Sequence, residues 1–147
     1  MIGFVDAIKM FFRRYVDFQG RSTRAEYWWV ALFQIIAVII LMIPAFGVIG
    51  TMAENSGEFG AGAALSFLPV GLFALAVIIP NIALFIRRLH DINLTGWVYL
   101  GLVIAGFIPL VGLLSSIAQI VIACIPGTPG PNKYGDDPFG RTSDVFT

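Results

Sequence analysis

Three stretches of the chain contain no charged residue and are long enough to cross a membrane. They are 27, 28 and 41 residues long and lie between Glu26 and Glu54, between Glu58 and Arg87, and between Asp91 and Lys133. A transmembrane helix needs about 20 consecutive, mostly apolar residues. Each stretch therefore predicts membrane-spanning helix, and the expected fold class is an all-α membrane protein.

Composition supports this class and argues against several others. Charged residues make up 12% of the chain, whereas soluble domains typically contain roughly 25%. Nine basic residues balance nine acidic ones, so nothing indicates a nucleic-acid partner. The single cysteine excludes an intrachain disulfide, and the single histidine argues against a clustered metal site. We therefore expect no cofactor and no metal, and no pattern of catalytic residues is evident.

The first eighteen residues are expected to form an amphipathic helix over 4–18. Their apolar side chains recur at spacings of four and three, which places them in one stripe: Phe4, Ile8, Phe11, Tyr15 and Phe18. This aromatic stripe, flanked by Arg13 and Arg14, favours a helix that lies in the headgroup plane of a membrane. Packing of the stripe on the protein's own helices is the alternative.

A single membrane domain over 1–125 is expected to hold this interfacial helix and membrane helices over 25–50, 65–87 and 97–125. Thr23 and Glu26 form a capping-box pattern that opens the first membrane helix. Pro80 is expected to kink the second. Residues 51–64 are polar and contain no lysine or arginine, so they are expected to connect the two.

The third apolar region, 97–125, allows two arrangements. One helix of 29 residues would be about 43 Å long, so it would cross a bilayer tilted and kinked at Pro109. Alternatively, two short arms turn at Pro109 as a re-entrant hairpin, which gives four membrane segments. We favour the single crossing because the twelve-residue first arm is too short to span. The tail, 126–147, is rich in proline and glycine and is expected to be extended or irregular.

The distribution of lysine and arginine indicates the orientation. The N-terminal segment carries five of them, residues 51–64 none, and the loop 87–96 two. Short cytoplasmic loops are enriched in these residues, so the N-terminus and the loop 87–96 are expected in the cytoplasm and 51–64 outside. The tail lies outside in the single crossing and in the cytoplasm in the hairpin.

Two groups of ionisable residues on the expected cytoplasmic side form the candidate binding site. The members are Arg21, Arg24 and Glu26, then Arg87, Arg88, His90 and Asp91, with Trp97 where the chain re-enters the membrane. A shared basic patch suits an anionic lipid headgroup, a phosphate-bearing substrate or an acidic partner. The alternative is structural: the arginines set the topology and extend to phosphates, while Asp91 and His90 close the loop.

Further contacts of this site depend on the fold. Four-residue spacing would bring Arg87 and Asp91 to one helix face. His90 beside a carboxylate is the one plausible acid–base centre. In the hairpin arrangement the tail returns to the cluster and adds the last candidates, with Tyr134 or Asp136 able to bond an arginine. These tail candidates are Asn132, Tyr134 and Asp136.

Three uncharged polar side chains, Gln34, Asn81 and Gln119, lie within the expected membrane helices. Gln34 and Asn81 are about 9–12 Å inside the cytoplasmic boundary, at a helical rise of about 1.5 Å per residue. An interhelical hydrogen bond between them is expected, and a permeation path is the alternative. Gln119 reaches the same depth only in the hairpin.

Three motifs in a fixed order resemble a known family. They are FQGRSTRAEYWW at 18–29, RRLHD at 87–91 followed by TGW at 95–97, and GTPGPNKYGDDP at 127–138. Together they resemble the bacterial inner-membrane family called domain of unknown function 805, over roughly residues 4–140. The resemblance implies an inner-membrane location and no particular activity, so no site residue is carried over from it.

The expected function is that of a small, non-enzymatic inner-membrane protein that binds through its cytoplasmic basic cluster. Its expected partners are anionic lipid headgroups, and also a second copy of the chain or another membrane protein. One alternative is a transporter or channel built by oligomerisation, because three helices enclose too little space for a polar path. A second alternative is a membrane-surface enzyme that acts on a lipid-linked substrate.

Overall fold

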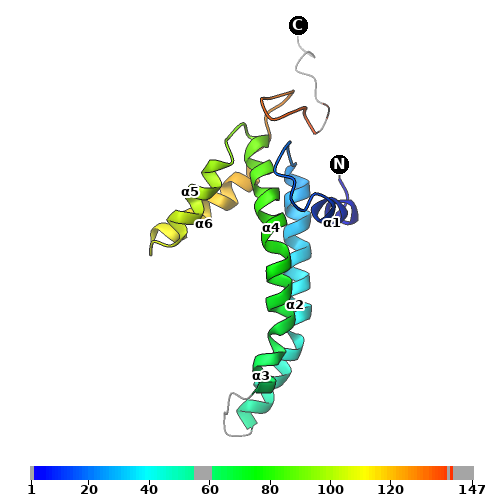
Figure 1. The fold of residues 1–147 in the computed structure, drawn as a ribbon, viewed down its shortest axis with the longest axis vertical. Helices are drawn as coiled ribbons and strands as arrows, with labels where there is room; N and C mark the ends of the chain where they lie inside the picture. Colours follow the sequence, from blue (N-terminus) through cyan, green and yellow to red (C-terminus); the bar gives the residue numbers. More distant parts are fainter. Residues whose placement is uncertain (1, 55–60, 139, 141–147) are drawn as a thin grey trace. The chain divides into compact units, whose positions relative to one another are not determined.

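A computed structural model describes residues 2–54, 61–138 and 140, and these residues form six α-helices (Figure 1). In chain order the helices are α1 (Phe4–Arg13), α2 (Arg24–Glu54), α3 (Ala61–Ser66), α4 (Leu68–Asp91), α5 (Trp97–Gly106) and α6 (Val111–Cys124). The described residues contain no strand, only an isolated bridge between Asn132 and Gly135. The all-α prediction is confirmed.

The helices divide between two compact units. The first unit comprises residues 1–30 and 79–147, and the second comprises 31–78. The second unit holds most of α2, all of α3 and the first half of α4, with the rings of Phe33 and Phe73 edge to face at 6.1 Å. The candidate site residues lie in the first unit, except for Gln34.

Two of the described helical segments are long and apolar enough to cross a membrane, namely Arg24–Ile49 and Ala64–Asp91. Large aliphatic side chains along the first of them remain exposed, such as Ile35, Ile39 and Ile43. A helix that is apolar on all sides suits hydrocarbon, because in water these side chains would require burial. Both segments match predicted membrane helices, and Pro44 and Pro80 lie inside helices that continue past them.

Thr23 starts α2 as predicted, through half of a capping box. Its hydroxyl oxygen accepts a hydrogen bond from the backbone N–H of Glu26 at 3.1 Å, which satisfies one of the free amides of the first turn. The Glu26 carboxylate does not complete the box by returning to the backbone. Its Oε1 lies 3.5 Å from Nη2 of Arg87 instead.

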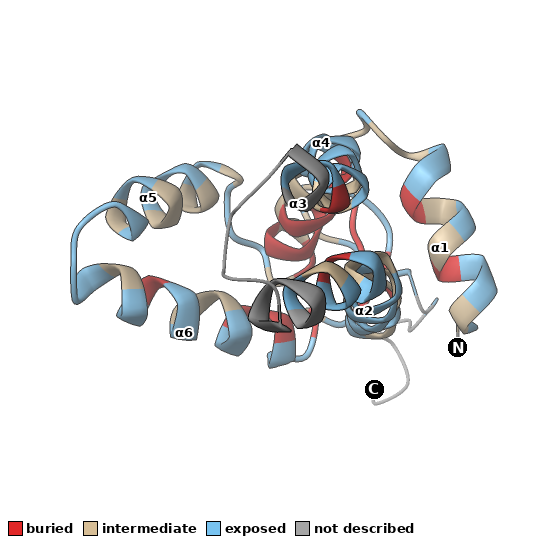
Figure 2. Cartoon of the chain, turned by 90° about the horizontal axis from the view of Figure 1, so that it is seen from below, coloured by how far each residue is buried: buried red, intermediate tan, exposed pale blue. Residues whose placement is uncertain are grey.

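The N-terminal helix is shorter than the predicted 4–18, because α1 ends at Arg13. Arg14 stops it: its guanidinium donates to the Asp17 carboxylate at 2.8 Å and to the Gln19 carbonyl at 2.9 Å, which holds the chain in a turn. Helix α1 has buried positions on one side (Figure 2). Of the predicted apolar stripe, Phe11 is fully buried and Phe18 is 39% exposed, and Ala7 beside the stripe is also fully buried. At least part of α1 therefore packs on the protein itself, which was the alternative to placement in the headgroup plane. Placement in the headgroup plane stays a prediction.

Residues 97–125 form two helices and not one, so the favoured single kinked helix is wrong and the two-armed alternative matches the described residues. Re-entry of these arms into the membrane stays a prediction. Helices α5 and α6 lie side by side and turn at Pro109 (Figures 1 and 2). Leu110 has a φ of 68°, and a Cβ on Gly112 would lie 2.6 Å from the Gly106 carbonyl oxygen. The Ser115 hydroxyl donates to the Leu102 carbonyl at 2.6 Å across the two arms. The prediction failed because it required each arm to span.

The chain after α6 is irregular, as predicted, and is tied to the end of α4. The Thr128 N–H donates to the Asp91 carbonyl at 2.9 Å, and the Thr128 hydroxyl donates to the same oxygen at 3.0 Å. The predicted polar connection 51–64 is partly helical, because α2 continues to Glu54 and α3 begins at Ala61. Its residues 55–60, and residues 139 and 141–147 of the tail, lie outside the described residues.

Candidate functional site

Three segments that are remote in sequence meet at a cluster of buried charges. They are the start of α2, the end of α4 and the tail after α6. We call the charged residues the buried arginine cluster, and its members are Arg21, Glu26, Arg87, Arg88 and Asp91. The side chains of Arg87 and Arg88 are 0% exposed and that of Asp91 is 1% exposed. Buried charges are costly unless they are paired and hydrogen-bonded, so the contacts decide what this cluster does.

Asp91 is the centre of the cluster because two arginines share its carboxylate. Arg21 donates from Nε to Oδ1 at 3.0 Å, and Arg88 donates from Nη1 to Oδ2 at 2.6 Å. Other nitrogens of the two guanidinium groups donate to backbone carbonyls of the chain after α6, whereas the buried Nε of Arg88 has no hydrogen-bond partner among the described residues. Arg21 reaches Gly130 at 2.7 Å and Thr128 at 2.5 Å, and Arg88 reaches Ile125. The tail is thus held to α4 through charge-assisted hydrogen bonds.

Arg87 ties α4 to the segment before α2. Its Nε donates to the Ser22 hydroxyl at 2.9 Å, and its Nη1 donates to the carbonyls of Arg14, at 3.2 Å, and Asp17. The Ser22 N–H donates in return to the Arg87 carbonyl at 3.1 Å. The ion pair with Glu26 is looser, and neither Nη2 nor Oε1 has a hydrogen-bond partner among the described residues.

The arginine contacts differ from the sequence prediction in two respects. Asp91 pairs with Arg88, three residues away, and with Arg21, whereas Arg87 turns to Ser22 and Glu26. The four-residue spacing of Arg87 and Asp91 therefore does not lead to an ion pair between them. In addition, Arg21, Arg87 and Arg88 are buried against protein partners, so they do not extend to phosphates. Arg24 is exposed and only reaches the Cys124 carbonyl, at 3.4 Å.

A second, half-exposed ion pair joins Arg14 and Asp17 beside the cluster. Slight burial opposes ionisation of the Asp17 carboxyl, but hydrogen bonds from Arg14 and the Gln19 amide hold its pKa below the usual value. The pair stabilises the turn whose carbonyls bind Arg87.

His90 and Asp91 do not form the expected acid–base centre. The His90 ring stacks on Tyr134, with centroids 3.8 Å apart and planes within 6°, and its Nδ1 lies 3.2 Å from the Gly20 carbonyl oxygen. The Asp91 carboxylate is occupied by Arg21 and Arg88. The two side chains therefore serve different partners, although they are adjacent in the chain.

The tail returns to the cluster, as the hairpin arrangement implied. Asn132 donates from its side-chain amide to the His90 carbonyl at 2.9 Å, and Tyr134 covers the His90 ring. Asp136 is exposed, and within the described ranges neither Tyr134 nor Asp136 bonds Arg87 or Arg88. Trp97 is 75% exposed at the start of α5.

The intramembrane polar side chains are each half-buried, and Gln34 belongs to the second unit while Asn81 and Gln119 belong to the first. Hydrogen bonding between Gln34 and Asn81 stays a prediction.

Sequence reasoning missed three residues that the cluster needs: Ser22, Gly127 and Thr128. A Cβ on Gly127 would lie 2.0 Å from Oδ2 of Asp91, so only glycine allows this approach. Each of the three lies inside one of the recognised motifs, and membership of a motif is the sequence feature that could have identified them. The motifs at 18–29, 87–97 and 127–138 supply all of the cluster's charged residues and two of the five carbonyls that its arginines bind, those of Thr128 and Gly130.

Comparison with known proteins agrees with the motifs. Residues 15–136 match the family described as protein of unknown function DUF805. The chain belongs to this family. The DUF805 protein is 36% identical to inner membrane protein YhaI of Escherichia coli strain K12 over 130 residues, which cover 87% of this chain and 92% of YhaI. It is 33% identical to inner membrane protein YhaH of the same strain over 126 residues, which cover 86% and 90% of the two chains.

These relatives support a location in the bacterial inner membrane for this DUF805 protein, as the motif resemblance implied. No solved structure matches the chain.

Proposed function

We propose that this DUF805 protein binds anionic lipid headgroups at the cytoplasmic face of the inner membrane, through the exposed basic residues Lys9, Arg13 and Arg24. The supporting observation is that these basic residues fall into two groups, one buried and one exposed. Arg21, Arg87 and Arg88 are buried and paired within the protein, whereas Lys9, Arg13 and Arg24 are exposed. The buried arginine cluster then serves as the scaffold, and the exposed residues serve as the binding surface.

The surface of α1 suits the membrane interface. Besides Lys9 and Arg13, it exposes the apolar side chains Val5 and Phe12, and Val16 is exposed in the turn that follows. A helix that presents both basic and apolar side chains binds where anionic headgroups meet hydrocarbon. One face of α1 thus packs on the protein while another is free to enter the interface.

The proposed topology is multi-pass, with α2 and α4 as full crossings. Helices α5 and α6 have 10 and 14 residues, or about 15 and 21 Å at the helical rise, less than the roughly 30 Å of hydrocarbon. They form a hairpin that enters the membrane and returns to the same face. Hydrogen bonds from Arg21 and Thr128 to Asp91 support one shared face for the N-terminal segment, the α4–α5 loop and the tail.

Reporter fusions test this topology. Because the tail is bonded to α4 beside the arginine-rich N-terminal segment, both ends of the chain are expected in the cytoplasm. Green fluorescent protein fused to the C-terminus should fluoresce, and alkaline phosphatase fused there should be inactive. A cysteine at position 55, in a Cys124→Ala background, should react with an impermeant reagent from outside. Active phosphatase at the C-terminus would contradict the hairpin topology.

Charge removal tests the lipid-binding surface. The triple variant Lys9→Gln, Arg13→Gln, Arg24→Gln is expected to bind phosphatidylglycerol vesicles about a hundredfold more weakly, since each basic side chain near an anionic surface contributes about 1 kcal/mol. A matched variant that keeps the charges, Lys9→Arg, Arg13→Lys, Arg24→Lys, should bind like the wild type. Equal phosphatidylglycerol binding by all three proteins, with the fold intact, would refute the proposal.

A further inference from the structure

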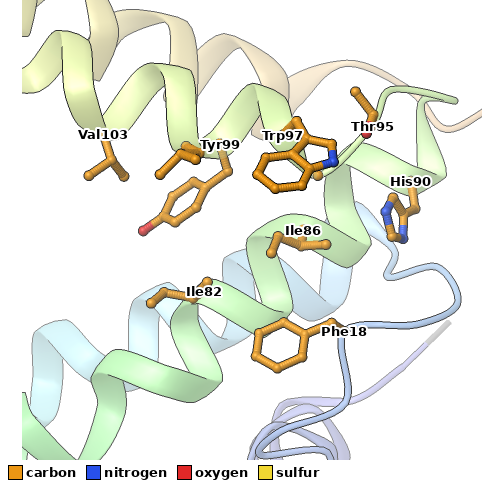
Figure 3. Close-up of a pocket in the computed structure, with 10 residues that line it drawn as sticks. Phe18, Ile82, Ile86, His90, Thr95, Trp97, Tyr99 and Val103 are labelled. Carbon is orange, nitrogen blue, oxygen red and sulfur yellow. The ribbon is translucent and has the colours of Figure 1, made fainter.

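An apolar pocket lies between α4, α5 and the segment before α2, entirely within the first unit (Figure 3). Its volume is about 600 Å³. Most of its lining is apolar, including Phe18, Ile82, Ile86, Leu100 and Val103. Pockets for small ligands typically measure about 300–1,000 Å³, so this one is large enough for an organic molecule.

One end of the pocket is polar, because His90 and Thr95 line it there. The Gly20 carbonyl can only accept a hydrogen bond, so Nδ1 of His90 must carry the hydrogen that it donates. In the neutral imidazole, Nε2 then has a free lone pair. This atom lies beside Gly96, another lining residue, where a Cβ would be 3.7 Å away. The pocket therefore offers polar contacts at this end and mostly apolar contacts along the rest of its lining, where Tyr99 is the exception because it carries a hydroxyl.

The lining of the pocket changes from polar to apolar along α4 and α5, in the direction that leads from the surface of a bilayer to its interior. His90 is in the last turn of α4, and Ile82 lies eight residues earlier, about 12 Å deeper at the helical rise. Trp97 begins α5, and Val103 follows six residues later. The polar end is thus at the level of the helix ends, and the apolar end is at the level of the hydrocarbon. At the rim, Trp97 and Leu100 are 75% and 46% exposed, toward the space that lipid fills.

We propose that this pocket binds one acyl chain of a bilayer phospholipid, with the polar end of the lipid beside His90 and Thr95. An apolar cavity of this size that opens onto a membrane is filled at least cost by hydrocarbon, because burial of each methylene is favourable and water gains few partners there. This site is separate from the surface formed by Lys9, Arg13 and Arg24, and it does not depend on binding of headgroups at that surface.

Photocrosslinking tests the pocket in the full chain, reconstituted in vesicles doped with phosphatidylcholine that carries a diazirine near the end of one acyl chain. The label is expected on the lining segments, in residues 82–86 and 97–103. Val103→Phe should reduce this labelling about tenfold or more, since excluding even two buried methylenes costs a factor of that order. Ile104→Phe places the same ring on the exposed side of α5, outside the pocket lining, and should leave the labelling unchanged.

Unreduced labelling in folded Val103→Phe would overturn the proposal. If that variant does not fold, the positions labelled in the wild type provide the test. Labelling confined to the exposed side of α2 would equally overturn the proposal. The zwitterionic probe keeps this test apart from the headgroup proposal. An acyl-chain pocket is labelled in the triple variant of Lys9, Arg13 and Arg24 as in the wild type, whereas phosphatidylglycerol binding by that variant reports on the surface alone.

Discussion

Replacing Asp91 by asparagine is expected to destabilise the protein by about 3–5 kcal/mol, the usual cost of removing one partner from a buried ion pair. Asparagine keeps the shape of the side chain but removes the charge that balances Arg21 and Arg88. Both guanidinium groups would stay buried, because each also binds backbone carbonyls: Arg21 those of Gly130 and Thr128, and Arg88 that of Ile125. Loss of folded protein is therefore expected at temperatures where the wild type is stable, measured by thermal unfolding in a mild detergent.

The control is Asp136→Asn, which removes the same charge from an exposed tail residue and should change the melting temperature little. A double-mutant cycle adds a sharper test. Arg21→Gln should cost much less stability in the Asp91→Asn background than in the wild type, since the two side chains form one unit. Additive effects would mean that Arg21 and Asp91 do not act as one unit, and an Asp91→Asn protein as stable as the wild type would mean that the cluster contributes no net stability.

Local patterns in the sequence were sufficient for the long helices and for the charged members of the site. Uncharged runs predicted α2 and α4 because the length of a span is set by the bilayer. Thr23 predicted the start of α2 because a capping hydroxyl acts on amides only three residues away. Arg21, Arg87, Arg88 and Asp91 were singled out because charge is rare in this chain.

The arrangement within the site could not be predicted in the same way. The positive-inside rule gives the side of the membrane on which an arginine lies, but it does not distinguish a buried arginine from an exposed one. Arg87 and Arg88 are neighbours with the same sequence environment, yet one binds Ser22 and the other binds Asp91. This choice depends on Ser22 and Thr128, which reach α4 only after the chain has folded back twice.

The hairpin shows why length alone was a misleading criterion. In the sequence the first arm has twelve residues, too short to span, and this favoured one long helix over two. In the structure the arms are helices of 10 and 14 residues. However, a hairpin needs only to satisfy its backbone and to bury part of its surface, and Ser115 helps by bonding the Leu102 carbonyl. Thr128 bonds Asp91, so the chain between them must run away from α4 and come back, which takes two arms and not one. This contact between residues 37 positions apart is not visible in the sequence.

Replacing Gly127 by alanine is expected to detach the tail from α4. The added Cβ would lie 2.0 Å from Oδ2 and 2.6 Å from Cγ of Asp91, and this carboxylate cannot move aside because Arg21 and Arg88 hold both of its oxygens. The tail must yield instead, which breaks the bonds of Thr128 with Asp91 and Arg21. We expect a cost of about 1–3 kcal/mol for overpacking, with about 1 kcal/mol more for each hydrogen bond lost.

The readout should separate local detachment from global unfolding. A cysteine at position 137, a tail residue that is buried while the tail is attached, in a Cys124→Ala background, should react with a maleimide much faster in Gly127→Ala than in its parent. Gly101→Ala is the matched control, because a Cβ there would meet nothing within 4 Å in the middle of α5. It should leave the reaction rate unchanged and raise stability by up to about 1 kcal/mol. Equal reactivity in both alanine variants would mean that Asp91 and the tail tolerate a side chain at position 127, and that the cluster does not hold the tail as closely as its contacts require.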